Sequence, residues 1–258
     1  MACLLGSASL VAAAPAEIPL TECRSMKTDF MKASKGWIAE NSAQDTYSIT
    51  SNGLEMRLVP PSQYVRLHDS NSNMPYNKYE GRGPTFNVST LMRYGRFSAT
   101  MRSAPVGGAI TAFIVLADDG DEIDFEILGG DPHHLQTNFF YGKRPLYTVN
   151  GGLHEVPGEA VYDAFHTYTV DWRPERIEWL VDDKVIRTVQ KKDTCDANEC
   201  RYPSSPGRIQ LGLWDGSFEA GTAEWSHGPI DWSQHHSISS YIKSVEVDCD
   251  PQYNKVIS

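Results

Sequence analysis

The chain has 258 residues and a formal net charge of −10, and 22% of its residues are charged. This acidic balance, without a cluster of lysine or arginine, excludes nucleic acid and anionic membrane surfaces as expected partners and leaves neutral polymers open. A hydrophobic content of 40% is sufficient for a packed core. The length suits two small domains or one large all-β domain.

The N-terminus reads MACLLGSASLVAAAPAEIPLTEC. Its apolar stretch, 4–14, is too short to span a bilayer, and AAAPA is typical of a signal-peptidase cleavage region. We therefore expect a signal peptide at 1–16, a single domain at 17–258 and a secreted protein; a frayed apolar N-terminus is the alternative. The C-terminal DPQYNKVIS has no apolar tail, so no lipid-anchor signal is expected within this sequence, and an anchor that was removed is left open.

Short segments of alternating polarity dominate the rest of the chain, with Gly, Pro, Asn and Asp between them. One pair, RIEWLVDDKVIRTV, predicts a hairpin with the two-residue turn Asp182–Asp183. No segment longer than about ten residues has a helical period. The pattern predicts an all-β sandwich of two antiparallel sheets. In chain order, the predicted strands are 46–49, 54–59, 95–102, 109–116, 121–128, 135–141, 166–172, 176–181, 184–189, 208–214 and 241–248.

The segment GDEIDFEILGG carries the chemistry. Successive side chains of a strand point to opposite faces, so Glu122, Asp124 and Glu126 share one face while the apolar residues between them share the other. Three like charges in a row cost stability unless their pKa values shift or they share protons. A polar outer face or a calcium site is the structural alternative.

Paired carboxylates suit retaining glycoside hydrolysis, in which one is the nucleophile and the other the proton donor. Glu122 and Glu126 have Cα atoms roughly 13 Å apart on an extended strand, and their side chains can lean toward each other to the required separation of about 5–5.5 Å. Asp124 lies between them and can hold their pKa values apart.

DEIDFEILGGDPHHLQTNFFYG resembles the signature of glycoside hydrolase family 16, in its E-x-D-x-E form. The segments YGRFSATMRSAPVGGAITAFIVL and FHTYTVDWRPERIEWLVDDKVIR resemble other strands of the family, and GTAEWSHGPIDWS resembles its fungal Crh-type branch, which joins chitin to β-glucan in cell walls. The resemblance covers roughly 86–247. It implies a concanavalin-like β-jelly-roll with a concave substrate groove, and it implies that Glu122 is the nucleophile, Asp124 the helper and Glu126 the acid/base.

The sequence departs from the Crh-type pattern in three places. Only Cys23 remains of a cysteine-rich N-terminal segment, the loop DGSFEA after Trp214 is short, and Ser226 and His227 stand where small residues are common. These departures leave the preferred acceptor open.

Two further strands offer sugar-binding residues on one face. Strand 208–214 presents Gln210 and Trp214 with Gly212 between them, and strand 135–141 presents Gln136 and Asn138. Aromatic platforms and side-chain amides suit sugar rings and hydroxyls. Core packing of Trp214, and hydrogen bonding of the amides to the acids, are the alternatives.

The segment GTAEW supplies Thr222, Glu224 and Trp225, which we expect at the rim of the groove on the acceptor side. Other candidates are assigned structural roles: Trp37, Trp172 and Trp179 to the core, and His133, His134, His235 and His236 to loops. No metal or cofactor is expected, because no carboxylate pattern accompanies the histidines.

The cysteines and one sequon fit export. Without Cys3, four cysteines remain and allow three pairings; we favour Cys195–Cys200 and Cys23–Cys249. NVS at Asn87 is a glycosylation sequon, and such motifs are common by chance.

The expected function is a secreted, monomeric retaining transglycosylase of the fungal cell wall, with chitin and β-1,3/1,6-glucan as partners. It is expected to cleave a β-linked polysaccharide, either chitin or β-glucan, and to transfer it to a β-glucan acceptor. An endo-β-1,3(4)-glucanase is the first alternative, and a lectin-like module without turnover is the alternative of another class.

Overall fold

The computed structural model describes residues 20–40, 42–144 and 146–257. The predicted signal peptide lies outside these residues. All eleven predicted strands are present, with ends that move by a few residues. The all-β prediction is therefore confirmed.

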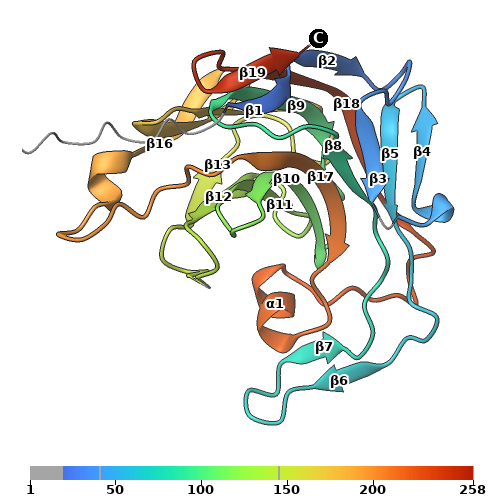
Figure 1. The fold of residues 1–258 in the computed structure, drawn as a ribbon. Coiled ribbons are helices and arrows are strands. Elements are labelled where there is room, and N and C mark those ends of the chain that lie inside the picture. The colour runs from blue at the N-terminus through green and yellow to red at the C-terminus, as the bar shows by residue number, and fades with distance from the viewer. Residues whose placement is uncertain (1–19, 41, 145, 258) are drawn as a thin grey trace, which may run out of the picture.

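Seven antiparallel strands form the first sheet, in the spatial order β13-β12-β11-β10-β17-β8-β3 (Figure 1). This sheet contains the acidic strand Glu122–Leu128. Its strands are β3 (Trp37–Glu40), β8 (Thr85–Val88), β10 (Ala109–Ala117), β11 (Glu122–Leu128), β12 (His134–Phe140), β13 (Gly152–Glu155) and β17 (Gly207–Asp215).

The second sheet packs against the first, in the order β16-β15-β14-β9-β18-β5-β4, with β2 also paired to β18. Its predicted hairpin is confirmed, because Asp182 and Asp183 both have positive φ, the conformation of the tight primed turn. Its strands are β2 (Met26–Asp29), β4 (Tyr47–Thr50), β5 (Gly53–Leu58), β9 (Gly95–Arg102), β14 (His166–Trp172), β15 (Arg176–Val181), β16 (Lys184–Gln190) and β18 (Ile238–Cys249).

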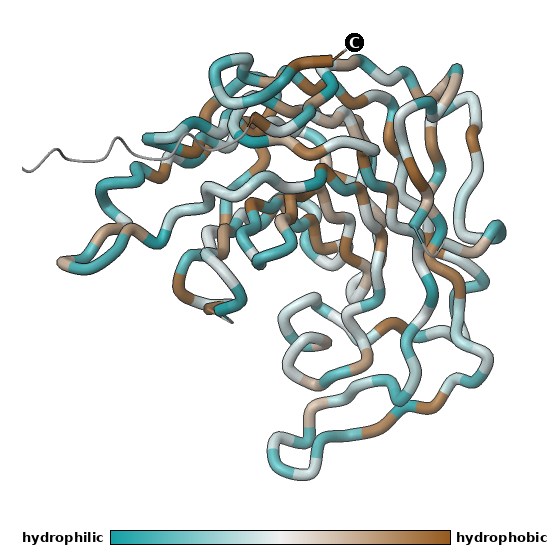
Figure 2. Tube along the Cα trace, viewed as in Figure 1, coloured by the Kyte–Doolittle hydropathy of each residue, from teal (hydrophilic) through white to brown (hydrophobic). Residues whose placement is uncertain are grey.

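The core lies between the two sheets, and Figure 2 shows apolar residues recurring along the strands of both. Phe97 of β9 meets Phe113 of β10 edge to face at 5.3 Å, and Phe125 of β11 meets Tyr168 of β14 at 5.6 Å. Such aromatic contacts across the sandwich fix which face of each strand is buried. The predicted core tryptophans Trp37, Trp172 and Trp179 are all buried.

The remaining elements are short and do not belong to the two large sheets. Two strand pairs stand apart from the large sheets: β1 (Thr21–Arg24) pairs in parallel with β19 (Asn254–Ile257), and β6 (Arg66–His68) pairs with β7 (Pro75–Asn77). The helical elements are η1 (Gln44–Thr46), η2 (Lys191–Thr194) and α1 (Ala220–Trp225). The described residues contain no helical segment that could span a bilayer.

Both predicted disulfides are confirmed. Cys23 of β1 is bonded to Cys249 at the end of β18, with the Cα atoms 6.1 Å apart, and Cys195 is bonded to Cys200. The first bond joins two ends of the described chain across a separation of 226 residues, which strongly restricts the unfolded ensemble.

Candidate active site

Strand β11 places the three carboxylates on the face of the first sheet that points away from the second sheet. We call this side the carboxylate face. Ile123, Phe125 and Ile127 point the other way and are fully buried. Across the sheet, Glu126 lies opposite Gln136 of β12, and Asp124 lies opposite Asn138. The predicted separation into an apolar and an acidic face is confirmed.

Asp121 does not belong to this set. It precedes β11, and its buried carboxylate accepts hydrogen bonds from the backbone N–H groups of Gly142 at 2.8 Å, Ser204 at 2.7 Å and Ser205 at 3.0 Å. Placing the start of the strand at 121 was therefore wrong by one residue. Asp121 satisfies backbone donors of two loops rather than facing a substrate.

The two glutamates have raised proton affinities. Burial raises the pKa of Glu122 to about 7. Burial and the charge of Glu122 raise the pKa of Glu126 to about 7. Because ionisation of one carboxyl makes ionisation of the other harder, the pair passes through a state with one carboxylate and one carboxylic acid near neutral pH. A nucleophile and a proton donor need that state.

Asp124 is the most deeply buried of the three, with 2% of its surface exposed, and its Oδ1 atom has no hydrogen-bond partner within the described chain. Burial, followed by the charges of Glu126 and Glu122, raises its pKa well above the ordinary range, while the Asn138 backbone amide and Arg187 act in the opposite direction. A protonated Asp124 limits the number of like charges in the row.

Three of the predicted binding residues meet at the Glu126 end of the row. The Trp225 indole N–H donates to Gln136 Oε1 at 2.9 Å, and the Trp225 ring stacks on Trp214 with centroids 6.0 Å apart and planes at 23°. Both tryptophans are half-buried, so core packing does not account for Trp214. Helix α1, absent from the sequence-based prediction, brings Trp225 to this point.

The register of the sheet places the other amides on the same face. Asn138, Asp124, Ile114 and Gln210 lie in one row across β12, β11, β10 and β17. The next row sets Glu126 beside Ala112, and Ala112 beside Gly212. A Cβ atom added at Gly212 would meet only the Ala112 side chain, at 3.9 Å, so the face is open above this glycine.

Thr222 and Glu224 lie on α1 with Trp225, at half-buried and exposed positions respectively. Neither side chain forms a hydrogen bond or an ion pair with the three carboxylates. Their role at the rim of the groove stays a prediction.

A pocket of about 260 Å³ opens beside Glu122 at the other end of the row. Phe140, which lies opposite Glu122 on β12, meets Tyr147 edge to face at 5.9 Å. Lys143 and Arg144 also border this pocket. Sequence reasoning missed Tyr147 and the two cations, because they lie in the loop after β12, where no periodicity indicates their direction.

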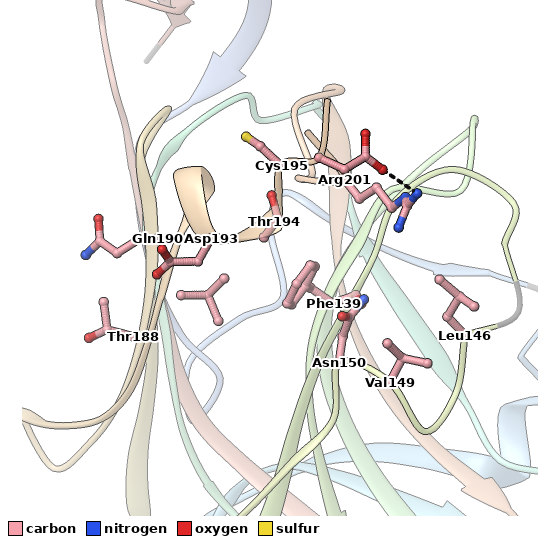
Figure 3. A pocket seen from close by; sticks show the side chains of 12 residues that line it. Phe139, Leu146, Val149, Asn150, Thr188, Gln190, Asp193, Thr194, Cys195 and Arg201 are labelled. Atoms are coloured by element: carbon pink, nitrogen blue, oxygen red, sulfur yellow. Dashed lines mark hydrogen bonds and ion pairs between the residues drawn. The ribbon is translucent and has the colours of Figure 1, made fainter. Parts of the chain in front are cut away.

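A second pocket, of about 440 Å³, lies on the other side of β12, between the β12–β13 loop and the η2 segment (Figure 3). Its lining includes Phe139, Asn150 and Gln190 but none of the three carboxylates. Because Phe139 and Phe140 point to opposite faces of β12, this pocket is separate from the one at Glu122.

Two structural expectations are modified. His134, expected in a loop without a carboxylate partner, begins β12, and its Nδ1 lies 2.8 Å from Asp131 Oδ1. Asn87 lies in β8 with 3% of its surface exposed, and its side-chain amide donates to a Glu40 carboxylate oxygen, so this sequon is buried in the folded chain.

Comparison with known proteins identifies the class. The sequence model of glycosyl hydrolases family 16 matches residues 41–234. This chain belongs to that family. The match begins earlier than the predicted resemblance at 86–247.

Individual relatives narrow the comparison. The chain is 36% identical over 172 residues to Crh-like protein 5 of Aspergillus fumigatus, covering 66% of this chain and 42% of that protein. It is 42% identical over 151 residues to the probable glycosidase CRR1 of Saccharomyces cerevisiae, covering 56% of this chain and 35% of that protein. The chain thus matches less than half the length of these relatives.

Among solved structures, the Crh5 transglycosylase in complex with NAG superposes with a TM-score of 0.74 at 26% identity, over 90% of this chain and 88% of that one. The β-jelly-roll fold expected from the resemblance is confirmed.

Proposed function

We propose that this chain is a retaining transglycosylase of the fungal cell wall, which cleaves a β-linked polysaccharide and transfers it to a β-glucan acceptor. The observation that carries the proposal is the carboxylate row on β11, where burial raises the pKa values of Glu122 and Glu126 to about 7 on one face of the first sheet. The names of the relatives, a glycosidase and a transglycosylase, support the same chemistry.

In the proposed mechanism, ionised Glu122 attacks the anomeric carbon of the donor sugar while protonated Glu126 gives its proton to the leaving oxygen. A glycosyl ester forms on Glu122. Glu126, now ionised, takes a proton from an acceptor hydroxyl, which displaces Glu122 and restores both groups. Burial raises the pKa of both glutamates to about 7, so these values do not distinguish the nucleophile from the acid. The two roles are therefore assigned from the family motif.

Asp124 supports this cycle by remaining protonated between the two glutamates. The row then carries one negative charge when the donor binds, rather than three. The stacked pair Trp214–Trp225 offers an aromatic surface for a sugar ring beside Glu126. A water molecule in place of the acceptor hydroxyl would turn transfer into hydrolysis.

Chitin is proposed as donor and β-1,3/1,6-glucan as acceptor, with the protein monomeric and located in the cell wall. The proposal draws on the NAG complex of the Crh5 transglycosylase and on the neutral, hydroxyl-rich character of these polymers.

A product assay tests it. The chain is incubated with chitin oligomers and a fluorescently labelled β-glucan, and the products are analysed by mass spectrometry. Hybrid products support transfer, shortened glucan indicates an endo-β-glucanase, and unchanged sugars indicate a binding module. The Glu122→Gln variant should form no product, and retained activity would refute the assigned nucleophile.

A further inference from the structure

Arg187 of β16 joins the two sheets behind the carboxylate row. Its Nη1 donates to the Thr137 carbonyl oxygen at 2.9 Å and to the Thr137 hydroxyl at 2.8 Å, and its Nη2 donates to the Asn150 carbonyl oxygen at 2.5 Å. Thr137 is fully buried and lies on the core side of β12. One guanidinium from the second sheet therefore fixes β12 and the end of the loop that follows it.

The same guanidinium also packs on Trp179, the residue that binds the backbone of Asp124. It lies 4.7 Å above the Trp179 ring, and the Trp179 indole N–H donates to the backbone carbonyl of Asp124 at 3.0 Å. Trp179 is fully buried. A stacked cation of this kind restricts the ring beneath it, and the ring in turn fixes the backbone at the centre of the carboxylate row.

The loop after β12 depends on the same anchor. Asn150, whose carbonyl Arg187 binds, also donates from its side chain to the Phe139 carbonyl at 3.2 Å, and Figure 3 shows Asn150 and Phe139 close together in the pocket behind β12. Earlier in this loop, Tyr147 borders the pocket at Glu122. Strand β11, strand β12 and this loop therefore share one contact point.

We propose that Arg187 is a positioning residue for the carboxylate row, acting through Trp179 on Asp124 and through Thr137 and Asn150 on β12 and the loop that borders the pocket at Glu122. Nothing in the motif E-x-D-x-E points to a residue so distant in sequence. An effect of Arg187 on kcat rests on the proposed function, whereas an effect of Arg187 on the titration of Asp124 does not.

The titration of the Asp124 carboxyl depends on the charged groups around it. Glu122 and Glu126 flank it on its own strand, and the charge of Arg187 acts on it from the core side of the sheet. The neighbours opposite it on β10 and β12, Ile114 and Asn138, are uncharged. Arg187 lowers the pKa of Asp124 against the effect of burial, so loss of the cation should raise it further.

The test compares Arg187→Met and Arg187→Lys with the control Arg102→Met. Arg102 is a matched control because its guanidinium also lies 4.7 Å above an aromatic ring, that of Tyr241, and it forms no hydrogen bond or ion pair with the carboxylate row. The pKa of Asp124 is followed by NMR of the side-chain carboxyl carbons. It should rise in Arg187→Met, stay near the wild-type value in Arg187→Lys, and not change in the control.

The kinetic readout separates positioning from general stability. Arg187→Met should lower kcat about 10-fold or more with KM within about twofold, because misplaced reacting groups slow chemistry more than binding. Arg187→Lys keeps the charge but lacks the planar fork, so it should recover only part of kcat. The control should keep both constants.

Three outcomes would overturn the proposal. One is wild-type kcat in Arg187→Met with only a lower melting temperature, and another is an unchanged Asp124 titration. If Arg187→Met does not fold, wild-type kcat in Arg187→Lys is the third. A wild-type protein that forms no product on any glycan would instead refute the proposed function, and the Asp124 titration would still decide the role of Arg187.

Discussion

Replacing Glu122 by glutamine should stabilise the protein at alkaline pH and leave its stability at acidic pH unchanged. A glutamate has a reference pKa of 4.5, whereas burial raises the pKa of Glu122 in the folded protein to about 7. The folded state therefore holds this proton more tightly than the unfolded chain does. The free energy of unfolding therefore has its full value, as far as Glu122 is concerned, below pH 4.5. It falls as the pH rises from 4.5 to about 7 and Glu122 loses its proton.

The size of the effect follows from the two pKa values. Since a tenfold change in proton affinity is worth about 1.4 kcal/mol, ionised Glu122 costs the folded state about 3 kcal/mol. Glutamine has nearly the same shape and carries no charge, so it removes this cost. For a domain of this size, 3 kcal/mol corresponds to a rise in melting temperature of about 6–12 °C.

The assay is urea unfolding of the wild type and the variant at about pH 4 and about pH 8. The exposed loop residue Glu159 provides a matched control, because Glu159→Gln makes the same chemical change outside the cleft. The gain for Glu122→Gln should be near zero at the lower pH and about 3 kcal/mol at the higher pH. An equal gain at both pH values would refute the idea that Glu122 is buried where its charge is costly.

Three other changes test other parts of the structure. Trp214→Ala removes the ring that stacks on Trp225, and we expect KM to rise about 10-fold with kcat within about twofold, measured with a soluble oligosaccharide donor. Gly212→Leu adds a side chain above the open floor beside Ala112, so kcat/KM should fall about 100-fold while the melting temperature stays within about 2 °C of the wild-type value; a large loss of stability would show that this space is not open. Removal of the Cys23–Cys249 bond by serine substitution at both positions should cost about 5 kcal/mol in urea unfolding, because the bond closes a long loop, and an unchanged midpoint would contradict that estimate.

The alternation of side chains made the central strands predictable. From 122 to 127 in β11 every second residue is acidic and every residue between is apolar, so the faces follow from the sequence alone. The primed turn at Asp182–Asp183 was recognisable for a similar local reason. The first residue of the strand was not predictable in this way, because Asp121 and Glu122 are both acidic. Only the folded chain shows that the Asp121 carboxylate binds backbone N–H groups of two loops.

Short elements without a pattern were not predictable. β3 and β8 have four residues each, and β1 and β19 are equally short, so alternation cannot distinguish them from loops. Helix α1 has six residues, fewer than two helical turns. Each of these elements is defined by the partner against which it packs rather than by its own sequence.

Contacts between distant residues account for what sequence reasoning missed in the site. Trp225 was predicted to border the groove, yet its hydrogen bond to Gln136 joins residues 89 positions apart, and no local signal encodes it. Arg187 meets Thr137 across 50 positions, from a strand that the sequence identified only as half of a hairpin. The raised pKa values follow from burial, which only the folded chain defines.

The parallel pair β1–β19 sets Cys23 opposite Val256, and Figure 1 shows this pair on the opposite side of the molecule from α1. A tether attached at either end of the described chain would therefore hold the protein by the same corner. Immobilised on a solid support through that corner, the molecule would hold α1, and with it the Trp225 end of the carboxylate row, on the side away from the support.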